Sequence, residues 1–105
     1  MSTIYMVRSF VEDPADRAAF DHWYSTHHLP LVAERYGVLE AWRLWSDTDP
    51  SCHVAAYRFR DADHMNNQSQ ATRDFLRADY EASWGKLVRT KETLRQVEHL
   101  VPQIK

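Results

Sequence analysis

Aromatic and imidazole side chains recur at helical spacing between Ala15 and Pro30. With 3.6 residues per turn they form one stripe on the surface of a helix, and His28 lies at its edge. The stripe consists of Phe20, Trp23, Tyr24 and His27. Because a proline cannot continue the helical hydrogen-bond ladder, the pattern predicts a helix that begins near Ala15 and stops at the histidine pair. One or both imidazoles should therefore approach a buried surface.

Runs of β-branched and aromatic residues predict four strands, and a second apolar repeat predicts a second helix. The predicted strands are Thr3–Val11, Val38–Ser46, Cys52–Arg60 and Thr93–Val101. The second helix follows from the three- and four-residue spacing of large apolar side chains between Asp61 and Gly85. The segment Lys86–Glu92 can either extend this helix or begin the last strand.

Capping and turn residues separate these elements. Asp13 can act as the N-cap of the first helix with Pro14 at its first position, and Gly37 closes the irregular stretch that follows that helix. Asp47–Pro50 is a turn that joins the second and third strands as an antiparallel hairpin. The order β-α-β-β-α-β is that of the split βαβ unit. We therefore expect one ferredoxin-like α+β domain over residues 1–105, with a four-stranded antiparallel sheet.

Both faces of the predicted sheet are apolar. In the first strand, one face carries Ile4, Met6 and Phe10 and the other carries Tyr5, Val7 and Val11. Two helices can cover only one face, and the other would form a larger exposed apolar patch than soluble monomers usually tolerate. We expect a homodimer in which two sheets face each other as a dimeric α+β barrel. The alternative is a monomer whose C-terminal segment folds across the open face.

Composition narrows the possible partners. The chain has 105 residues, 44% of them hydrophobic, with a formal net charge of −2 and lysines and arginines scattered along the sequence. Without a basic patch, nucleic acid is not an expected partner. No apolar run approaches the roughly 18 residues of a spanning helix, so no membrane is expected either. A single cysteine, Cys52, and the absence of a secretory signal pattern place the protein in the cytoplasm.

The aromatic and histidine residues of the first helix also form a family motif. Phe20-x-x-Trp23-Tyr24-x-x-x-His28-x-Pro30-Leu31 resembles the F-x-x-Y-W-x-x-x-H-x-P-L signature of EthD-like proteins, with the aromatic pair reversed. These proteins belong to the dimeric α+β barrel superfamily. The resemblance implies a homodimer with a pocket between sheet and helices. The superfamily includes muconolactone isomerases, polyketide cyclases, cofactor-independent monooxygenases and haem-degrading enzymes.

The two histidines of the motif are the candidate catalytic residues. The resemblance points to His28, whereas helical periodicity puts His27 nearer the centre of the apolar stripe. A histidine in the last turn of a helix lies near the negative end of the macrodipole, which favours its protonated form and suits a general acid or base. The structural alternatives are that His28 caps the last carbonyls and that His27 fills the edge of the core.

Other side chains are candidates for binding a small hydrophobic or aromatic ligand. They are Trp23, Tyr24, Arg43, His53, Tyr57 and Trp84. Arginine beside aromatic rings suits an anionic or enolate-bearing aromatic compound, and Arg8 and Arg58 share this character with Arg43. The alternative is that these arginines lie at the surface and that Trp84 packs in the core. His99 and Glu98 carry the same ambiguity.

Several site classes lack their sequence signals. The two glycines, Gly37 and Gly85, are far apart, so no phosphate-binding loop or dinucleotide fingerprint is present. The histidines do not form a zinc-helix pair, and we expect no metal. No serine or cysteine nucleophile motif occurs. We therefore expect no ATP, no NAD and no covalent hydrolysis.

These observations lead to three hypotheses. The first is a small-molecule enzyme that acts on an aromatic or polyketide-like compound by histidine-assisted proton transfer, as an isomerase, cyclase or cofactor-independent monooxygenase. The second is a haem-binding or haem-degrading protein with His27, His28, His53 or His99 as axial ligand. The third is a non-catalytic ligand-binding or stress-related dimer.

Overall fold

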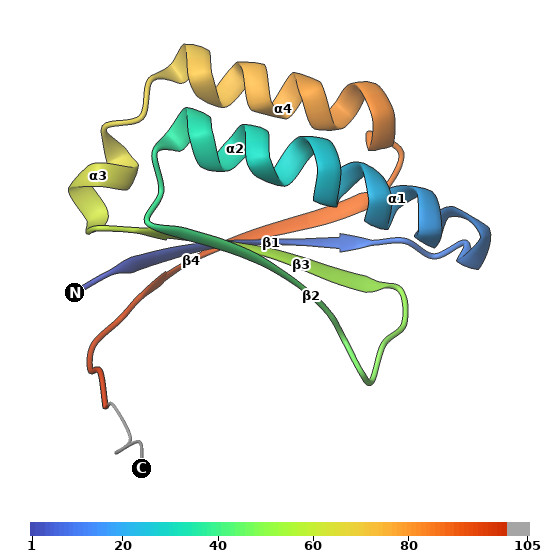
Figure 1. Cartoon of the computed structure of the whole chain (residues 1–105), viewed down its shortest axis with the longest axis horizontal. Coiled ribbons are helices and arrows are strands. Elements are labelled where there is room, and N and C mark those ends of the chain that lie inside the picture. Colours follow the sequence, from blue (N-terminus) through green and yellow to red (C-terminus); the bar gives the residue numbers. More distant parts are fainter. Residues whose placement is uncertain (101–105) are drawn as a thin grey trace.

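Four strands form one antiparallel sheet in the order β2-β3-β1-β4 (Figure 1). The structure is a computed structural model that describes residues 1–100. The strands are β1 (Thr3–Phe10), β2 (Glu40–Trp45), β3 (Cys52–Phe59) and β4 (Val88–Arg95). This sheet and the order of its strands confirm the predicted ferredoxin-like fold. The hairpin of β2 and β3 also pairs as expected.

All the helices pack on one face of the sheet, as Figure 1 shows. They are α1 (Arg17–Trp23), α2 (Leu29–Tyr36), α3 (Ala62–Asn66) and α4 (Gln70–Trp84). The cap at Asp13 is confirmed, because its carboxylate accepts a hydrogen bond from the amide of Ala15 at 3.0 Å. A 3-10 turn over Pro14–Asp16 then leads into α1.

The predicted end of the first helix at the histidine pair is wrong. The helix continues through a π-helical turn, Tyr24–His28, into α2 and ends only at Gly37. Gly37 has a φ of 61° and a ψ of 43°, the left-handed conformation that glycine adopts without strain and that commonly closes a helix. Both histidines therefore lie in the middle of a long helical segment.

The π-helical turn explains how Pro30 is tolerated. In an uninterrupted α-helix a proline removes one hydrogen bond and its ring clashes with the carbonyl four residues earlier. Here the register shifts just before the proline, because the amide of Leu29 donates to the carbonyl of Tyr24, five residues back. The hydroxyl of Thr26 donates to the carbonyl of His22 at 2.7 Å, so the local change leaves that acceptor satisfied. Pro30 then occupies the first turn of α2, where its missing amide hydrogen costs little.

Two other predicted boundaries need correction. The second helical region is two helices, because Asp61 caps α3 and Ser69 caps α4 through hydrogen bonds to the amides of His64 and Thr72. The last strand is Val88–Arg95 rather than Thr93–Val101, and Val101 lies outside the described residues. The strand pairs with the whole of β1, so the length of β1 fixes its ends.

The two faces of the sheet differ in their cover. The side chains of Val7 and Ser9 point toward the helices and are buried. The other face is not covered by a helix (Figure 1). The strand register places many apolar side chains on this face. They include Ile4, Met6, Phe10, Trp42, Leu44, Val54, Val88 and Leu94. Val88 is 67% exposed and Leu44 is 46% exposed, as expected from the apolar pattern on both faces.

His53 is a buried part of the core beneath α1. Its ring is fully buried against Phe20 and Tyr24. The guanidinium of Arg43 donates to Nε2 of His53 at 3.2 Å, so the proton of the ring resides on Nδ1, which has no hydrogen-bond partner among residues 1–100. Burial, together with the nearby charge of Arg43, lowers the pKa of His53 to about 4.

From the burial of His53 we predict that the fold loses stability as the pH falls. Between pH 6.5 and about 4 the unfolded chain takes up a proton that folded His53 does not, so the free energy of unfolding falls as the pH falls through this window. The slope attributable to His53 is about 1.4 kcal/mol per pH unit. Urea unfolding of the wild type and of His53→Phe at pH 7.0, 5.5 and 4.5 measures it. We expect a shallower pH slope for His53→Phe and an unchanged slope for exposed His22→Asn; equal slopes for His53→Phe and the wild type would contradict the assignment.

Candidate functional site

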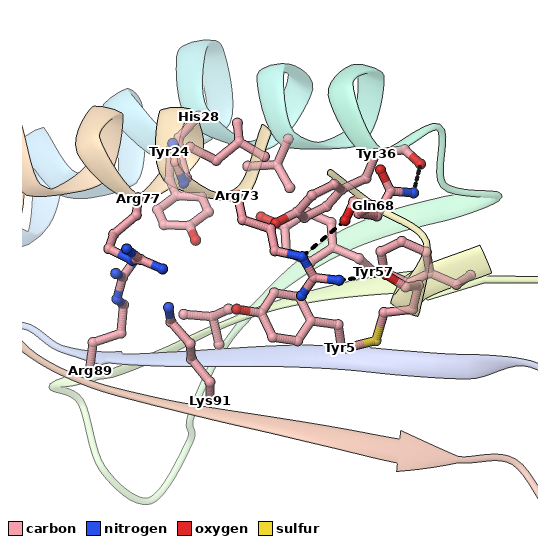
Figure 2. Close-up of a pocket in the computed structure, with 15 residues that line it drawn as sticks. Tyr5, Tyr24, His28, Tyr36, Tyr57, Gln68, Arg73, Arg77, Arg89 and Lys91 are labelled. Atoms are coloured by element: carbon pink, nitrogen blue, oxygen red, sulfur yellow. Dashed lines mark hydrogen bonds between the residues drawn. The ribbon is translucent and has the colours of Figure 1, made fainter. Parts of the chain in front are cut away.

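A cavity of about 280 Å³ lies between the sheet and helices α2 and α4 (Figure 2). Its floor comes from β1, β3 and β4, and its walls come from the helices and the π-helical turn. The lining residues are Tyr5, Val7, Tyr24, His28, Val32, Tyr36, Tyr57, Phe59, Met65, Gln68, Arg73, Leu76, Arg77, Arg89 and Lys91. Aromatic rings dominate one part of this lining and cationic groups another.

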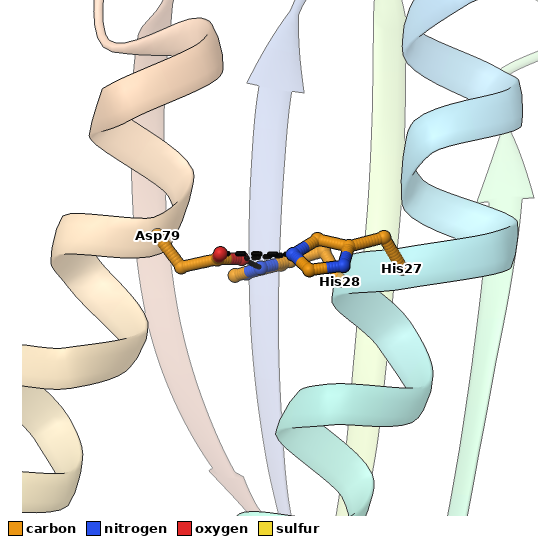
Figure 3. Close-up of polar contacts among 3 residues, drawn as sticks. All are labelled: His27, His28 and Asp79. Carbon is orange, nitrogen blue, oxygen red and sulfur yellow. Dashed lines mark hydrogen bonds and ion pairs between the residues drawn. The ribbon is translucent and has the colours of Figure 1, made fainter.

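His28 reaches the cavity while Asp79 holds it from behind. Nδ1 of His28 lies 2.8 Å from Oδ2 of Asp79, which belongs to α4 (Figure 3). Because an ionised carboxylate can only accept, Nδ1 carries the proton and Nε2 keeps its lone pair. Nε2 has no hydrogen-bond partner among residues 1–100. The imidazole also stacks on Trp23, with ring centroids 4.8 Å apart and planes 13° apart.

Burial decides the protonation state of His28. It lowers the pKa of His28, and the hydrogen bond that Nδ1 donates to Asp79 offsets part of that effect. The side chain is only 5% exposed. The imidazole is therefore neutral near pH 7 and can accept a proton. This corrects the sequence-based expectation of a protonated form, since His28 is not at a helix end and the macrodipole argument does not apply there.

His27 contacts the same carboxylate from the solvent side. Its Nε2 lies 2.8 Å from Oδ1 of Asp79, and its side chain is 50% exposed. Burial alone would raise the pKa of Asp79, but the hydrogen bonds of His27 and His28 outweigh it and hold that pKa below its usual range. Figure 3 shows both imidazoles directed at one carboxylate. His27 is not among the residues that line the cavity, and it shares the carboxylate of Asp79 with His28.

Tyrosine hydroxyls supply further polar groups at the cavity. Burial raises the pKa of Tyr24 and of Tyr57 above the ordinary value and raises that of Tyr5 to about 12, so all three remain protonated and able to donate. The hydroxyl of Tyr57 is buried without a partner among the described residues. A ligand oxygen could therefore replace the hydrogen bond that this group lacks.

The cationic lining was missed in the sequence analysis. Lysines and arginines look scattered along the chain, but the fold brings Arg73 and Arg77 of α4 together with Arg89 and Lys91 of β4 (Figure 2). The spacing within each pair could have indicated this cluster, because residues four apart share a helix face and residues two apart share a strand face. The uncertain boundary of β4 concealed the second pair.

Several predicted ligand-binding residues lie away from this cavity. Arg43 forms an ion pair with Asp21 at 2.9 Å and contacts His53 beneath α1. Trp84 packs edge-on against Phe20, with ring centroids 5.2 Å apart. Of the residues predicted for binding, only Tyr24 and Tyr57 line the cavity. Trp23 lies behind His28 and supports its ring.

The remaining candidates from the sequence lie outside the cavity lining. Arg8 pairs with Glu92 at 2.8 Å and Arg58 with Glu40 at 2.7 Å, both on the uncovered face of the sheet. His99 is exposed beyond β4, as is Glu98.

The described part of the chain has neither a metal-ligand cluster nor a membrane-spanning helix. Residues 1–100 contain no group of three or more potential metal ligands. No helix in the same range is long and apolar enough to cross a membrane.

Comparison with known proteins identifies structural relatives. Neither a protein-family profile nor a curated protein sequence matches the chain. An EthD family protein from Bacillus halodurans is 18% identical, with a TM-score of 0.69 over 90% of this chain and 99% of that one. SnoaB from Streptomyces nogalater, a cofactor-independent oxygenase, is 15% identical, with a TM-score of 0.72 over 94% and 96%.

A third solved structure carries a ligand. It is a monooxygenase from Streptomyces coelicolor in complex with nanaomycin D, 14% identical, with a TM-score of 0.70 over 97% of this chain and 93% of that one. At these identities the likeness concerns the fold. The chain therefore shares the α+β fold of an EthD family protein and of oxygenases that include a cofactor-independent one, in agreement with the motif of its first helix.

Proposed function

We propose that this protein is a small-molecule enzyme that removes a proton from a bound aromatic or polyketide-like compound, with Nε2 of His28 as the base. The observation that carries the proposal is a neutral, buried imidazole at the cavity wall whose other nitrogen is fixed by Asp79. A neutral imidazole can accept a proton and release it again.

The reaction also needs a hydrogen-bond donor for the oxyanion that develops, and the cavity offers two. When Nε2 takes a proton from carbon, the bonding electron pair moves to a neighbouring carbonyl, whose oxygen becomes an oxyanion. The hydroxyls of Tyr24 and Tyr57 are protonated donors at the cavity that can stabilise this charge. The proton can then return to a different atom, which completes an isomerisation or a cyclisation.

The same carbanion also suits oxygenation. With molecular oxygen as the oxidant, a CH₂ group next to a carbonyl adds O₂, and loss of water from the resulting peroxide leaves a ketone. Each turnover consumes one O₂ and returns the abstracted proton within the water. The likeness to a cofactor-independent oxygenase supports this variant.

No cofactor enters this proposal. A haem group fits the site poorly, because a cavity of about 280 Å³ is below the roughly 300–1,000 Å³ of sites for drug-sized ligands. Of the candidate axial ligands, His28 lines the cavity and has a free Nε2, whereas His53 lies fully buried outside the cavity and His27 and His99 are exposed. The volume of the cavity therefore argues against haem.

We further propose that a second copy of the chain covers the open face of the sheet. Leu44 and Val88 are exposed apolar side chains on that face, which also carries the ion pairs Arg8–Glu92 and Arg58–Glu40. An isologous dimer is the commonest way to bury such a face. The sequence pattern of two apolar faces supports the same assembly.

If the protein is a dimer, sedimentation equilibrium should give a mass twice the 12.4 kDa of the chain. Leu44→Glu places a charge on the uncovered face and should shift the protein to the monomer. Ala82→Glu, on the solvent side of α4, should leave the dimer intact. A wild-type particle of 12.4 kDa would contradict the proposed assembly.

Catalysis can be tested with 1,8-dihydroxyanthrone, an aromatic compound whose CH₂ group is acidic because its carbanion is conjugated through the rings with the carbonyl. The wild type should accelerate its O₂ uptake over buffer. His28→Asn removes the base, so we expect kcat to fall by about a hundredfold or more. An oxygen electrode and the absorbance of the product measure the rate.

His22→Asn is the matched control, because His22 lies on the exposed side of α1 and should leave the rate unchanged. Circular dichroism verifies that both variants fold. An unchanged rate for His28→Asn would contradict its role as base. Tight binding of the anthrone by the wild type with no product would instead indicate the non-catalytic ligand-binding alternative.

A further inference from the structure

Four cations and no carboxylate line the cavity. Arg73 and Arg77 extend from α4, and Arg89 and Lys91 extend from β4 toward the same space (Figure 2). Both pairs come from elements whose side-chain periodicity sets them on one face. Like charges that are held together around a cavity repel one another unless an anion binds between them.

The protein itself provides little compensating charge. The guanidinium of Arg73 donates to the backbone carbonyls of Met65, at 2.9 Å, and of its neighbours, which bear no formal charge. Arg89 lies over the ring of Tyr80, 3.9 Å from its centroid. Among residues 1–100, Arg77 is the one cation of the four with a carboxylate partner, Asp74, at 3.3 Å and about half exposed.

Lys91 is the clearest unpaired cation. It has no hydrogen bond or ion pair within residues 1–100, although it extends into the cavity region (Figure 2). Burial lowers its pKa, and the charges of Arg89 and Arg77 lower it further, against a weaker opposing effect of Glu81. An anionic ligand would relieve this repulsion.

Resting on the function proposed above, we infer that the ligand of this cavity is an aromatic carboxylate whose charged group lies among Arg77, Arg89 and Lys91. Planar guanidinium groups match a carboxylate with two parallel hydrogen bonds. The aromatic part of the ligand then lies against the rings of Tyr5 and Tyr57, whose centroids are 6.1 Å apart. The unpartnered hydroxyl of Tyr57 supplies a polar contact for a substituent on the ring.

A carboxylate fits better than a phosphate. Phosphate sites usually add backbone amides from a glycine-rich loop or a helix N-terminus. No glycine lines this cavity, and the two arginines of α4 come from the interior of the helix rather than its first turn. Side-chain cations are thus the only charged donors in the lining.

Isothermal titration with 2-naphthoate, its neutral isostere 2-naphthamide and 2-naphthyl phosphate tests this inference. The wild type should bind the carboxylate about tenfold more tightly than the amide, because only the carboxylate gains charge-assisted hydrogen bonds. Arg89→Met and Lys91→Met should each weaken naphthoate binding by about fivefold to tenfold and leave naphthamide unchanged.

Arg95→Met is the matched control, because Arg95 is on the same strand but outside the cavity lining. Its naphthoate affinity should equal that of the wild type. Equal affinities for acid and amide, no binding of either, or a preference for the phosphate would each overturn the inference.

The same titration separates this inference from the proposed function. His28→Asn should retain the preference for naphthoate over naphthamide, because His28 is neutral and supplies no positive charge. If the anthrone assay shows no turnover while the preference persists, the catalytic proposal fails and the carboxylate assignment stands. If turnover is found without the preference, the reverse holds.

Discussion

One carboxylate organises the candidate site. Asp79 on α4 accepts hydrogen bonds from His27 and His28, which lie on the facing helical segment. The contact joins the two helices, fixes the proton of His28 on Nδ1 and leaves Nε2 of this cavity-lining residue free to accept a proton. Without Asp79, burial would still hold His28 neutral, but nothing in its surroundings would choose between the two neutral tautomers. The chemistry proposed here therefore depends on this pairing more than on any other contact.

The π-helical turn brings this geometry about. Pro30 follows the histidine pair closely, and an ordinary α-helix would be broken there. One wider turn lets the helix continue, so that His28 lies in the interior of a long element backed by Trp23 rather than at a frayed end. π-Helical turns within α-helices are frequent at functional sites. Local backbone irregularity and a rigid histidine thus occur together.

The sequence predicted the fold better than the site. Alternation and turn residues located β1, β2 and β3 to within two residues, because apolar side chains recur along these strands and turn residues mark their ends. The edge strand β4 was placed too late, since its Lys, Arg, Thr and Glu residues hide the alternation. Its burial comes from pairing with β1, which no local pattern reveals.

The same limitation applies to the side chains of the cavity. The motif singled out His28, but Asp79 lies 51 residues away and has no sequence feature that links it to the histidines. Arg43 and His53 looked like ligand-binding residues, yet they contact each other beneath α1, away from the cavity. The cations of α4 and β4 come together only in the folded protein, where β4 pairs with β1 and α4 packs over the sheet. Pair contacts across the fold decide these roles, and local spacing does not encode them.

Nitrogen and carbon chemical shifts of the histidine rings, followed by NMR from pH 4 to pH 8, test the central claim most directly. We expect His28 to titrate below the ordinary histidine value of about 6.5 and, once neutral, to carry its proton on Nδ1. In Asp79→Asn that tautomer preference should weaken. A neutral form protonated on Nε2, or a pKa above 6.5, would contradict the account, because His28 would then present no free lone pair to the cavity.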